Sequence, residues 1–180
     1  MGQTYREQLW DLAVGQYGYV TTTDARALGI PVVELGKLAA RGRLHRVGHA
    51  VYRFEELPAD PRGQYLEAVL RVGPAAHLVG DAVLALHDLA LVNPRQIAVG
   101  TPRRTRAALP AWIRVVHDNT PPAEIVLYEG IPSVTITTAI RACVGTVMGE
   151  RLRDAVDDAE RRGLVLGRDA TALRHHLAAA

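Results

Sequence analysis

The chain has 180 residues, of which 48% are hydrophobic and 22% charged, the balance of an ordinary globular protein. This length suits one domain, or a small head followed by a larger body. No hydrophobic run approaches the roughly 20 residues that cross a bilayer, and the first residues lack the apolar stretch of a signal peptide. The only cysteine, Cys143, excludes an internal disulfide framework. We therefore expect a cytoplasmic protein without a membrane partner.

The formal net charge of +2 is too small to indicate a nucleic-acid partner by itself. The distribution of charge says more, because no acidic residue occurs between Glu34 and Glu55. The basic residues in this stretch are Lys37, Arg41, Arg43, Arg46 and Arg53. Such a concentration favours a surface that contacts phosphates. The alternative is a solvated basic face on a protein-interaction domain.

Two residue types that enzymes often use are almost absent. Ser133 is the only serine, and the segment around it lacks the glycines of a nucleophile elbow. Lys37 is the only lysine, and it lies neither in a phosphate-binding Walker loop nor two residues after an acidic residue, as a nuclease triad requires. We therefore predict that the protein is not an enzyme and has no catalytic residues and no cofactor.

Three helices are predicted near the N-terminus. Hydrophobic residues at helical spacing indicate a first helix over about 5–15. Thr22 or Thr23 is expected to cap a second, short helix over 24–28. A third helix is predicted over 31–41, with a proline in its first turn.

Two short strands follow, over 44–47 and 50–54, with a turn at Gly48-His49; we call this hairpin the wing. Three short helices and a hairpin within about 54 residues are the arrangement of a winged helix-turn-helix. We therefore predict a winged helix-turn-helix DNA-binding domain over 1–56, which we call the head.

The third helix of such a domain enters the major groove of double-stranded DNA. Leu35, Leu38 and Ala39 share one face and are expected to pack on the other helices, which leaves the opposite face for DNA. The predicted DNA-binding residues lie on that face, at the start of the second helix and on the wing: Thr21, Thr22, Thr23, Val33, Glu34, Lys37, Arg41, Arg43, Arg46 and His49. The basic residues from Lys37 to Arg53 could neutralise about four or five phosphates, so binding should weaken steeply with salt.

An acidic stretch broken by prolines, 55–61, is predicted to link the head to a body over 62–180. The body is predicted to be a mixed α/β domain with a small sheet, which makes the chain α+β as a whole. Its strands are expected at 96–100, 113–117, 125–128 and 134–137. Its helices are expected at 62–72, 80–91, 138–144, 149–162 and 170–177.

Residues 17–25 read YGYVTTTDA and residues 38–52 read LAARGRLHRVGHAVY. These segments resemble the N-terminal domain of AbiEi-type antitoxins, in which the third helix and the wing are joined by leucine, basic residues and glycine, followed by Val-Tyr. Here Gly48 is followed by His49 and Ala50, which makes the wing turn slightly longer than in the family pattern. Three segments of the body are similar to the C-terminal region of that family, namely 99–104, 114–117 and 130–135.

The resemblance implies an antitoxin of a type IV toxin–antitoxin system. Such antitoxins repress their own promoter through the winged helix and counteract a nucleotidyltransferase-like toxin, directly or functionally, through the C-terminal part. The alternatives are a DNA-binding regulator without a toxin partner and the DNA-binding remnant of an endonuclease-like protein, since longer relatives have such a domain after this region. The oligomeric state is open, with a homodimer as one alternative.

Two further groups of residues could form sites. Arg103, Arg104 and Arg106 lie on a loop between predicted strands and could contact the toxin or a nucleic acid, although a solvated loop explains them equally well. His77, Asp81 and His87 lack the spacing of metal ligands. We therefore predict no metal site.

Overall fold

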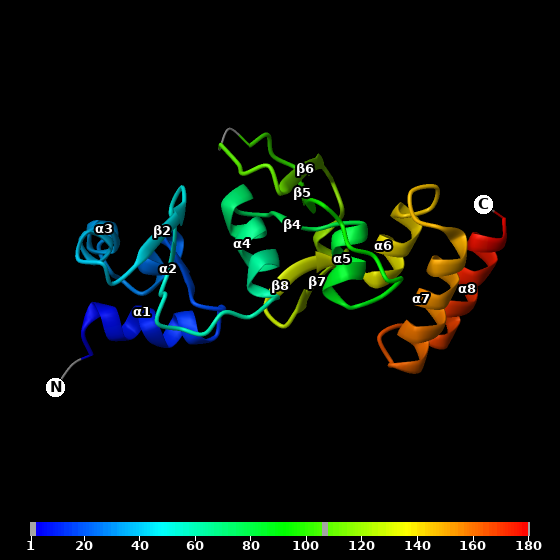
Figure 1. Cartoon of the computed structure of the whole chain (residues 1–180), viewed down its shortest axis with the longest axis horizontal. Helices are drawn as coiled ribbons and strands as arrows, with labels where there is room; N and C mark the ends of the chain where they lie inside the picture. The colour runs from blue at the N-terminus through cyan, green and yellow to red at the C-terminus, as the bar shows by residue number, and fades with distance from the viewer. Residues whose placement is uncertain (1–2, 106–107, 180) are drawn as a thin grey trace. The chain divides into compact units, whose positions relative to one another are not determined.

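The structure is a computed structural model that describes residues 3–105 and 108–179 (Figure 1). Its helices and strands confirm the predicted α+β class. The chain divides into two compact units, Met1–Pro74 and Ala75–Ala180, which we call the first and the second unit. The sequence predicted two parts, but the helix expected at the start of the second part belongs to the first unit.

The first unit contains the predicted winged helix-turn-helix. Its elements, in chain order, are α1 (Tyr5–Val14), β1 (Tyr19–Thr21), α2 (Thr22–Ala27), α3 (Val32–Ala40), β2 (His45–Gly48), β3 (Val51–Arg53) and α4 (Gly63–Val72). The strands form a three-stranded antiparallel sheet in the order β1-β3-β2. Helices α2 and α3 follow each other after a short turn, and β2 and β3 form the wing.

The second helix begins two residues earlier than predicted, because Thr21 caps it in place of Thr22 or Thr23. The Thr21 hydroxyl accepts a hydrogen bond from the Asp24 amide, and the Asp24 carboxylate accepts one from the Thr21 amide at 2.7 Å. This reciprocal pair is a capping box, which satisfies two amides at the helix start. Pro31 likewise lies at the cap position of α3 and not in its first turn.

The wing contains an irregularity that the sequence did not predict. Arg46 lies opposite Tyr52 and Gly48 opposite Val51, so Val47 is an extra residue in β2, as in a β-bulge. The turn itself is formed by His49 and Ala50, and Ala50 has a left-handed backbone with φ 60°. The strands therefore begin one residue later than predicted.

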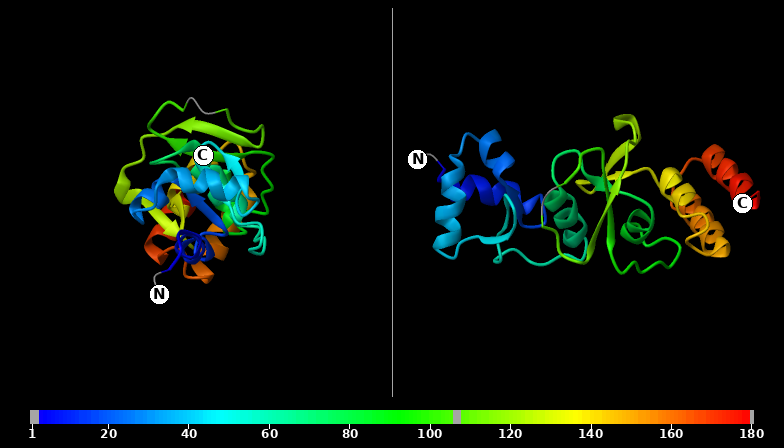
Figure 2. Two further views of the ribbon diagram at one scale, coloured as in Figure 1. Left: turned by 90° about the vertical axis from the view of Figure 1, so that its left-hand side faces the viewer. Right: turned by 90° about the horizontal axis from the view of Figure 1, so that it is seen from above.

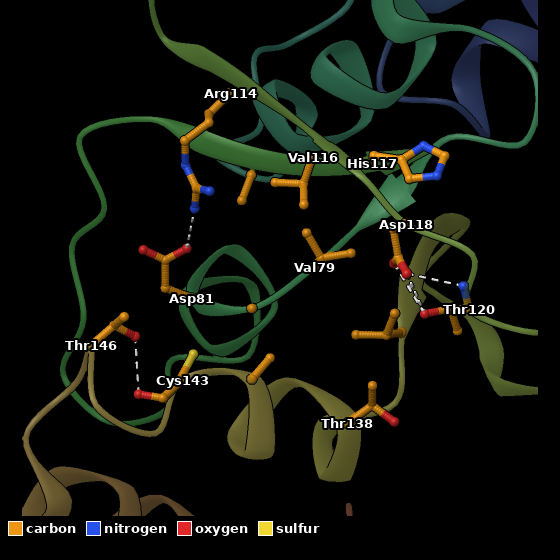
Figure 3. A pocket seen from close by; sticks show the side chains of 14 residues that line it. Val79, Asp81, Arg114, Val116, His117, Asp118, Thr120, Thr138, Cys143 and Thr146 are labelled. Carbon is orange, nitrogen blue, oxygen red and sulfur yellow. Dashed lines mark hydrogen bonds and ion pairs between the residues drawn. The ribbon is translucent and has the colours of Figure 1, made fainter. Parts of the chain in front are cut away.

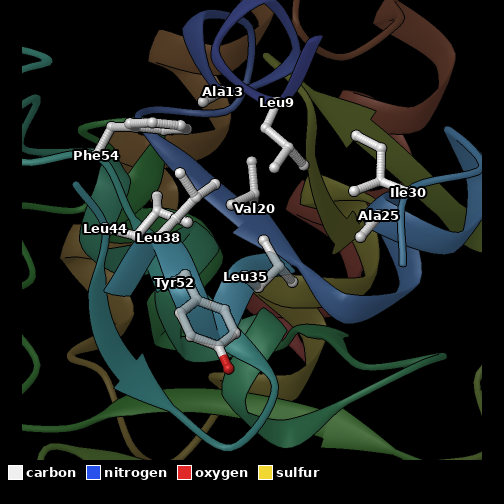
Figure 4. Packing of buried hydrophobic residues seen from close by; sticks show 10 residues of the cluster. All are labelled: Leu9, Ala13, Val20, Ala25, Ile30, Leu35, Leu38, Leu44, Tyr52 and Phe54. Carbon is white, nitrogen blue, oxygen red and sulfur yellow. The ribbon is translucent and has the colours of Figure 1, made fainter. Parts of the chain in front are cut away.

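Helices α1 to α3 and the wing of the first unit share one hydrophobic core (Figure 4). Leu35 and Leu38 of α3 contribute to it, as the sequence predicted, while Ala39 is partly buried against it. Phe54 follows the wing and contacts Trp10 of α1 edge-to-face, with 5.2 Å between the ring centroids. The buried members are Leu9, Ala13, Val20, Ala25, Ile30, Leu35, Leu38, Leu44, Tyr52 and Phe54.

The second unit is a mixed sheet with helices. Its elements are β4 (His77–Leu78), α5 (Asp81–Leu86), β5 (Ile97–Thr101), β6 (Ile113–His117), a 3-10 helix (Pro122–Glu124), β7 (Ile125–Tyr128), β8 (Ile131–Val134), α6 (Ile136–Ala142), α7 (Gly149–Arg161) and α8 (Gly167–Ala178). The sheet order is β6-β5-β4-β8-β7, with parallel pairs β5/β6 and β4/β8 and antiparallel pairs β4/β5 and β7/β8.

Three elements of the second unit differ from the prediction. Strand β4 was missed because it has only two residues. The predicted helix 80–91 ends at Leu86, since Asp88 and Ala90 adopt left-handed backbone angles. The strand expected at 134–137 lies at β8 instead, because Thr135 caps α6 by accepting a hydrogen bond from the Thr138 amide.

The last two helices pack side by side (Figure 2). Helix α7 buries one narrow stripe, Leu152, Ala155, Val156 and Ala159, while its other faces are rich in charged residues. Helix α8 contributes Leu173 and Leu177 to the buried surface. Among the described helices, none is long and apolar enough to cross a membrane.

The capping box of α2 can be tested with two threonine variants. Thr21→Ala should lower the free energy of unfolding of the first unit by about 1 kcal/mol, because it removes the cap acceptor. Thr23→Ala changes an exposed threonine of the same helix and should have a smaller effect. Urea unfolding followed by Trp10 fluorescence in a Trp112→Phe background measures both, since the chain has no other tryptophan. Equal losses would show that Thr21 is not the cap.

Candidate nucleic-acid interface

The outer face of α3 presents the side chains that the sequence predicted there. Val33 is 60% exposed, and the Lys37 side chain is 52% exposed. Arg41, directly after the helix, is exposed as well. Since Leu35 and Leu38 are buried in the core, the helix cannot rotate this face inward without exposing apolar surface. The packing of α3 therefore fixes which residues a DNA groove would meet.

Lys37 and Glu34 form an ion pair on this face, with 2.7 Å between Nζ and Oε1. An exposed pair of this kind contributes little to stability. Lys37 can therefore exchange Glu34 for a phosphate at small cost. The released Glu34 carboxylate would then be available to accept a hydrogen bond from a cytosine amino group.

The wing and the loop before it carry the next basic residues. Arg43 and His49 are exposed, and neither has an ion-pair partner among the described residues. Arg46 is exposed on β2, and its Nε donates to the Gly48 carbonyl at 3.3 Å, which holds the side chain along the wing. These three residues lie where a winged helix contacts the backbone or minor groove beside the recognition helix.

Arg53 does not belong to this group, although the sequence counted it with the basic stretch. Its Nη2 donates to the carbonyls of Leu57, at 2.9 Å, and Pro58, at 3.3 Å. Its guanidinium also lies over the Tyr19 ring, 5.8 Å from the centroid. Arg53 therefore ties the segment after the wing to the sheet, and the number of phosphates that the stretch could neutralise falls to about four.

At the start of α2, fewer amide groups are available to bind a phosphate than the sequence predicted. The Thr21 amide donates to the Asp24 carboxylate, and the Thr22 amide donates to the Ala50 carbonyl at 3.0 Å. Both groups are thus satisfied within the first unit. Thr23 is exposed and is the remaining candidate of the three.

Arg26 is a candidate contact that the sequence analysis did not select. It lies in the last turn of α2 and is exposed, with no ion-pair partner in the described part of the chain. The signal that could have indicated Arg26 is its position in the last turn of α2, the helix that precedes α3 in the helix-turn-helix. Arg26 was not predicted as a contact because it lies outside the stretch without acidic residues between Glu34 and Glu55.

The arginines of the second unit lie after β5. Arg103 and Arg104 are exposed, and the Arg103 amide donates to the Thr101 hydroxyl at 3.2 Å. Arg106 lies outside the described residues. The loop therefore presents at least two cations, whose contact with a partner stays a prediction.

The second unit also has a cavity of about 380 Å³ beside the sheet (Figure 3). Arg114 and Asp81 face each other at one end of it, with 3.7 Å between Nη2 and Oδ1. Asp118 and Thr120 lie at the other end. The sequence did not predict this cavity, because its walls come from β6, α5 and α6, which are far apart in the chain.

His77, which the sequence considered as a metal ligand, is paired with Asp118 instead. Its ring is 1% exposed, and Nε2 lies 2.8 Å from the Asp118 carboxylate while Nδ1 lies 3.2 Å from the Ala75 carbonyl. Burial alone would raise the pKa of Asp118, but hydrogen bonds from His77 and Thr120 outweigh it and hold this pKa below its usual range. Among the described residues, no group of three potential ligands could hold a metal ion.

Neither potential nucleophile of the second unit has the environment of a catalytic residue. Burial, and next the charge of Asp81, raises the pKa of the Cys143 thiol to about 11, so the thiol is protonated at neutral pH. Ser133 lies within β8 and is fully buried, unlike the exposed serine of a nucleophile elbow.

The His77–Asp118 pair predicts a pH-dependent stability. Because the folded pKa of Asp118 lies below its unfolded value of about 3.9, the carboxylate stabilises the second unit above that pH and loses this effect as the pH falls through the folded pKa. Asp118→Asn should therefore lower the free energy of unfolding by about 1–3 kcal/mol at pH 7, with a difference from the unmodified chain that shrinks toward pH 3. Trp112 fluorescence in a Trp10→Phe background measures this.

Asp154→Asn, which changes an exposed carboxylate on α7, is the matched control for this measurement. A constant difference between Asp118→Asn and the unmodified chain from pH 7 to pH 3 would contradict the assignment.

One comparison with known proteins found a match to the segment that carries these residues. No curated protein matches the chain in sequence. Residues 7–54, which run from the first turn of α1 to just after β3, match the family model described as transcriptional regulator, AbiEi antitoxin. The resemblance predicted for the head is thereby confirmed. Residues 7–54 are therefore similar to the AbiEi antitoxin family of transcriptional regulators.

Proposed function

We propose that this protein is an antitoxin that represses its own promoter and counteracts a nucleotidyltransferase-like toxin. The observation that carries the proposal is the position of the exposed cations within the domain that matches the AbiEi family. Lys37 and Arg41 lie on or directly after the exposed face of α3, and Arg43 and Arg46 lie on the adjoining loop and wing.

The first unit provides the DNA-binding activity in this proposal. Helix α3 enters the major groove with its outer face, where Glu34 and Lys37 reach base edges or the flanking phosphates. The wing places Arg46 and His49 on the neighbouring backbone. A homodimer would bind two such sites one helical turn apart, which matches a palindromic operator.

The second unit provides the action against the toxin. The toxin is either bound directly or counteracted on a common target, and the exposed Arg103 and Arg104 are candidates for a contact with it or with its nucleic acid. The protein acts in the cytoplasm without a cofactor and is not an enzyme in this proposal. Its regulatory effect needs only binding.

A second candidate function is supported by the same family match. The family description also names transcriptional regulation, so a DNA-binding regulator without a toxin partner is consistent with residues 7–54. The remnant of an endonuclease-like protein would share this DNA-binding head. A toxin gene beside the gene for this chain distinguishes the first proposal from both.

The DNA-binding assignment can be tested with Lys37→Ala/Arg41→Ala in the full chain. Binding to the promoter fragment in a gel shift should be lost at moderate salt. At low salt, a plot of the logarithm of affinity against the logarithm of salt concentration should have a slope whose magnitude is smaller by about 1.8. Each lost phosphate contact lowers this magnitude by about 0.9. Arg141→Ala, which removes an exposed cation of the second unit, should bind normally. Unchanged affinity of the double variant would exclude α3 as the recognition helix.

The division of labour between the units can be tested in cells. The full chain, co-expressed with the product of the adjacent toxin gene, should restore growth, and Lys37→Ala/Arg41→Ala should restore it equally while repression of a promoter reporter is lost. Co-purification with rescue indicates a direct complex, and rescue without it indicates action on a common target. If the unmodified chain represses the reporter but gives no rescue, the regulator without a toxin partner is the better description.

A further inference from the structure

Helix α4 packs against the winged helix, although it lies beyond both the predicted head and the segment that matches the family. Gly63, at the first turn, is buried so closely that an added Cβ would lie 3.3 Å from the Tyr17 Cβ and 3.5 Å from the Tyr19 ring. The helix is therefore a fixed part of the first unit and not a loose connection.

A chain of hydrogen bonds joins α4 to β1. The Tyr19 hydroxyl donates to one oxygen of the Glu67 carboxylate at 2.7 Å, and the Arg71 Nε donates to the other at 2.7 Å. Burial, and next the hydrogen bond to Glu67, raises the pKa of Tyr19, so the phenol stays protonated as a donor. Tyr19 of the sheet thus holds the Glu67 carboxylate, and this carboxylate in turn holds the Arg71 side chain.

The Arg71 side chain in turn contacts the wing. A Cβ added to Gly48 would be 3.1 Å from the Arg71 Cγ and 3.4 Å from its Nη1, so the side chain covers the backbone at this glycine. Gly48 is the last residue of β2, next to the extra residue Val47, and its carbonyl accepts the hydrogen bond from Arg46. The contact is thus made where the wing is irregular and where a predicted DNA-binding side chain is held.

We propose that Glu67 and Arg71 of α4 are positioning residues for the wing, and that the DNA-binding module extends to the end of α4. The two side chains, 16% and 18% exposed, hold β2 so that Arg46 and His49 meet the DNA backbone. The DNA part of this inference rests on the proposed function. The mechanical part, in which α4 restrains the wing, does not.

The mechanical part is tested first, in the full chain without DNA. Arg71→Ala should increase the rate of amide hydrogen exchange in peptides covering 45–53 by about five- to tenfold, because the wing loses its restraint. Gln64→Ala, at an exposed position of the same helix, and Arg141→Ala, which removes one positive charge elsewhere, are the controls and should leave exchange unchanged. Unchanged exchange in Arg71→Ala would overturn the proposal.

The second measurement is a double-mutant cycle on promoter DNA with Arg46→Ala. If Arg71 acts through the wing, Arg71→Ala should weaken binding about five- to tenfold, and adding Arg46→Ala to it should cost much less than Arg46→Ala alone. The salt slope of Arg71→Ala should also fall, because wing phosphates are no longer neutralised, whereas a loss of folded protein would leave this slope unchanged.

Fully additive losses in the cycle would overturn the positioning role. If the unmodified chain itself fails to bind promoter DNA, the proposed function fails, and the exchange measurement still decides whether α4 restrains the wing. Glu67→Gln, which keeps an acceptor for Tyr19 but removes the charge beside Arg71, should give intermediate exchange. An effect as large as that of Arg71→Ala would place the restraint in the ion pair itself.

Discussion

Burial of one shared hydrophobic core is the interaction on which the first unit depends. Helix α3 contributes Leu35, the wing contributes Tyr52, and the segment after it contributes Phe54 to the same cluster. Because these elements share one core, the exposed face of the helix and the path of the wing are fixed together. A domain of about 50 residues nevertheless buries only a modest share of its surface. The close approach of α4 at Gly63 to Tyr17 and Tyr19 therefore adds contacts beyond this small core.

The fold of the first unit also determines which partners the cations between Lys37 and Arg53 have. Of these five cations, Arg53 is directed to backbone carbonyls after the wing, and Lys37 pairs with Glu34 on the helix surface. Arg53 is therefore committed to the fold, whereas the exposed pair of Lys37 leaves that cation able to change partner. An acid-free run of sequence thus overstates the number of phosphate contacts, since some of its charges hold the fold.

The sequence predicted the features that depend on local pattern and missed those that depend on distant contacts. The three helices, the hairpin and the exposed side of α3 follow from hydrophobic spacing. The cap of α2 was placed on the wrong threonine, because three consecutive threonines satisfy the same preference and only the carboxylate of Asp24 selects Thr21. The pairing of His77 with Asp118 spans 41 residues and has no local signal. Likewise, nothing in the segment over 55–61 indicates that α4 contacts the wing, which only the approach of Arg71 to Gly48 shows.

The position of α4 has a consequence for how the two units could influence each other. The helix contacts the wing at Gly48 and ends at Val72, shortly before the second unit begins at Ala75. If a ligand of either unit displaced α4, the wing would lose its contact with Arg71 at Gly48. By thermodynamic linkage, operator DNA would alter the affinity for that ligand by the same factor. Under the proposed function, DNA binding and the binding of that ligand would then be coupled through the contact of Arg71 with Gly48.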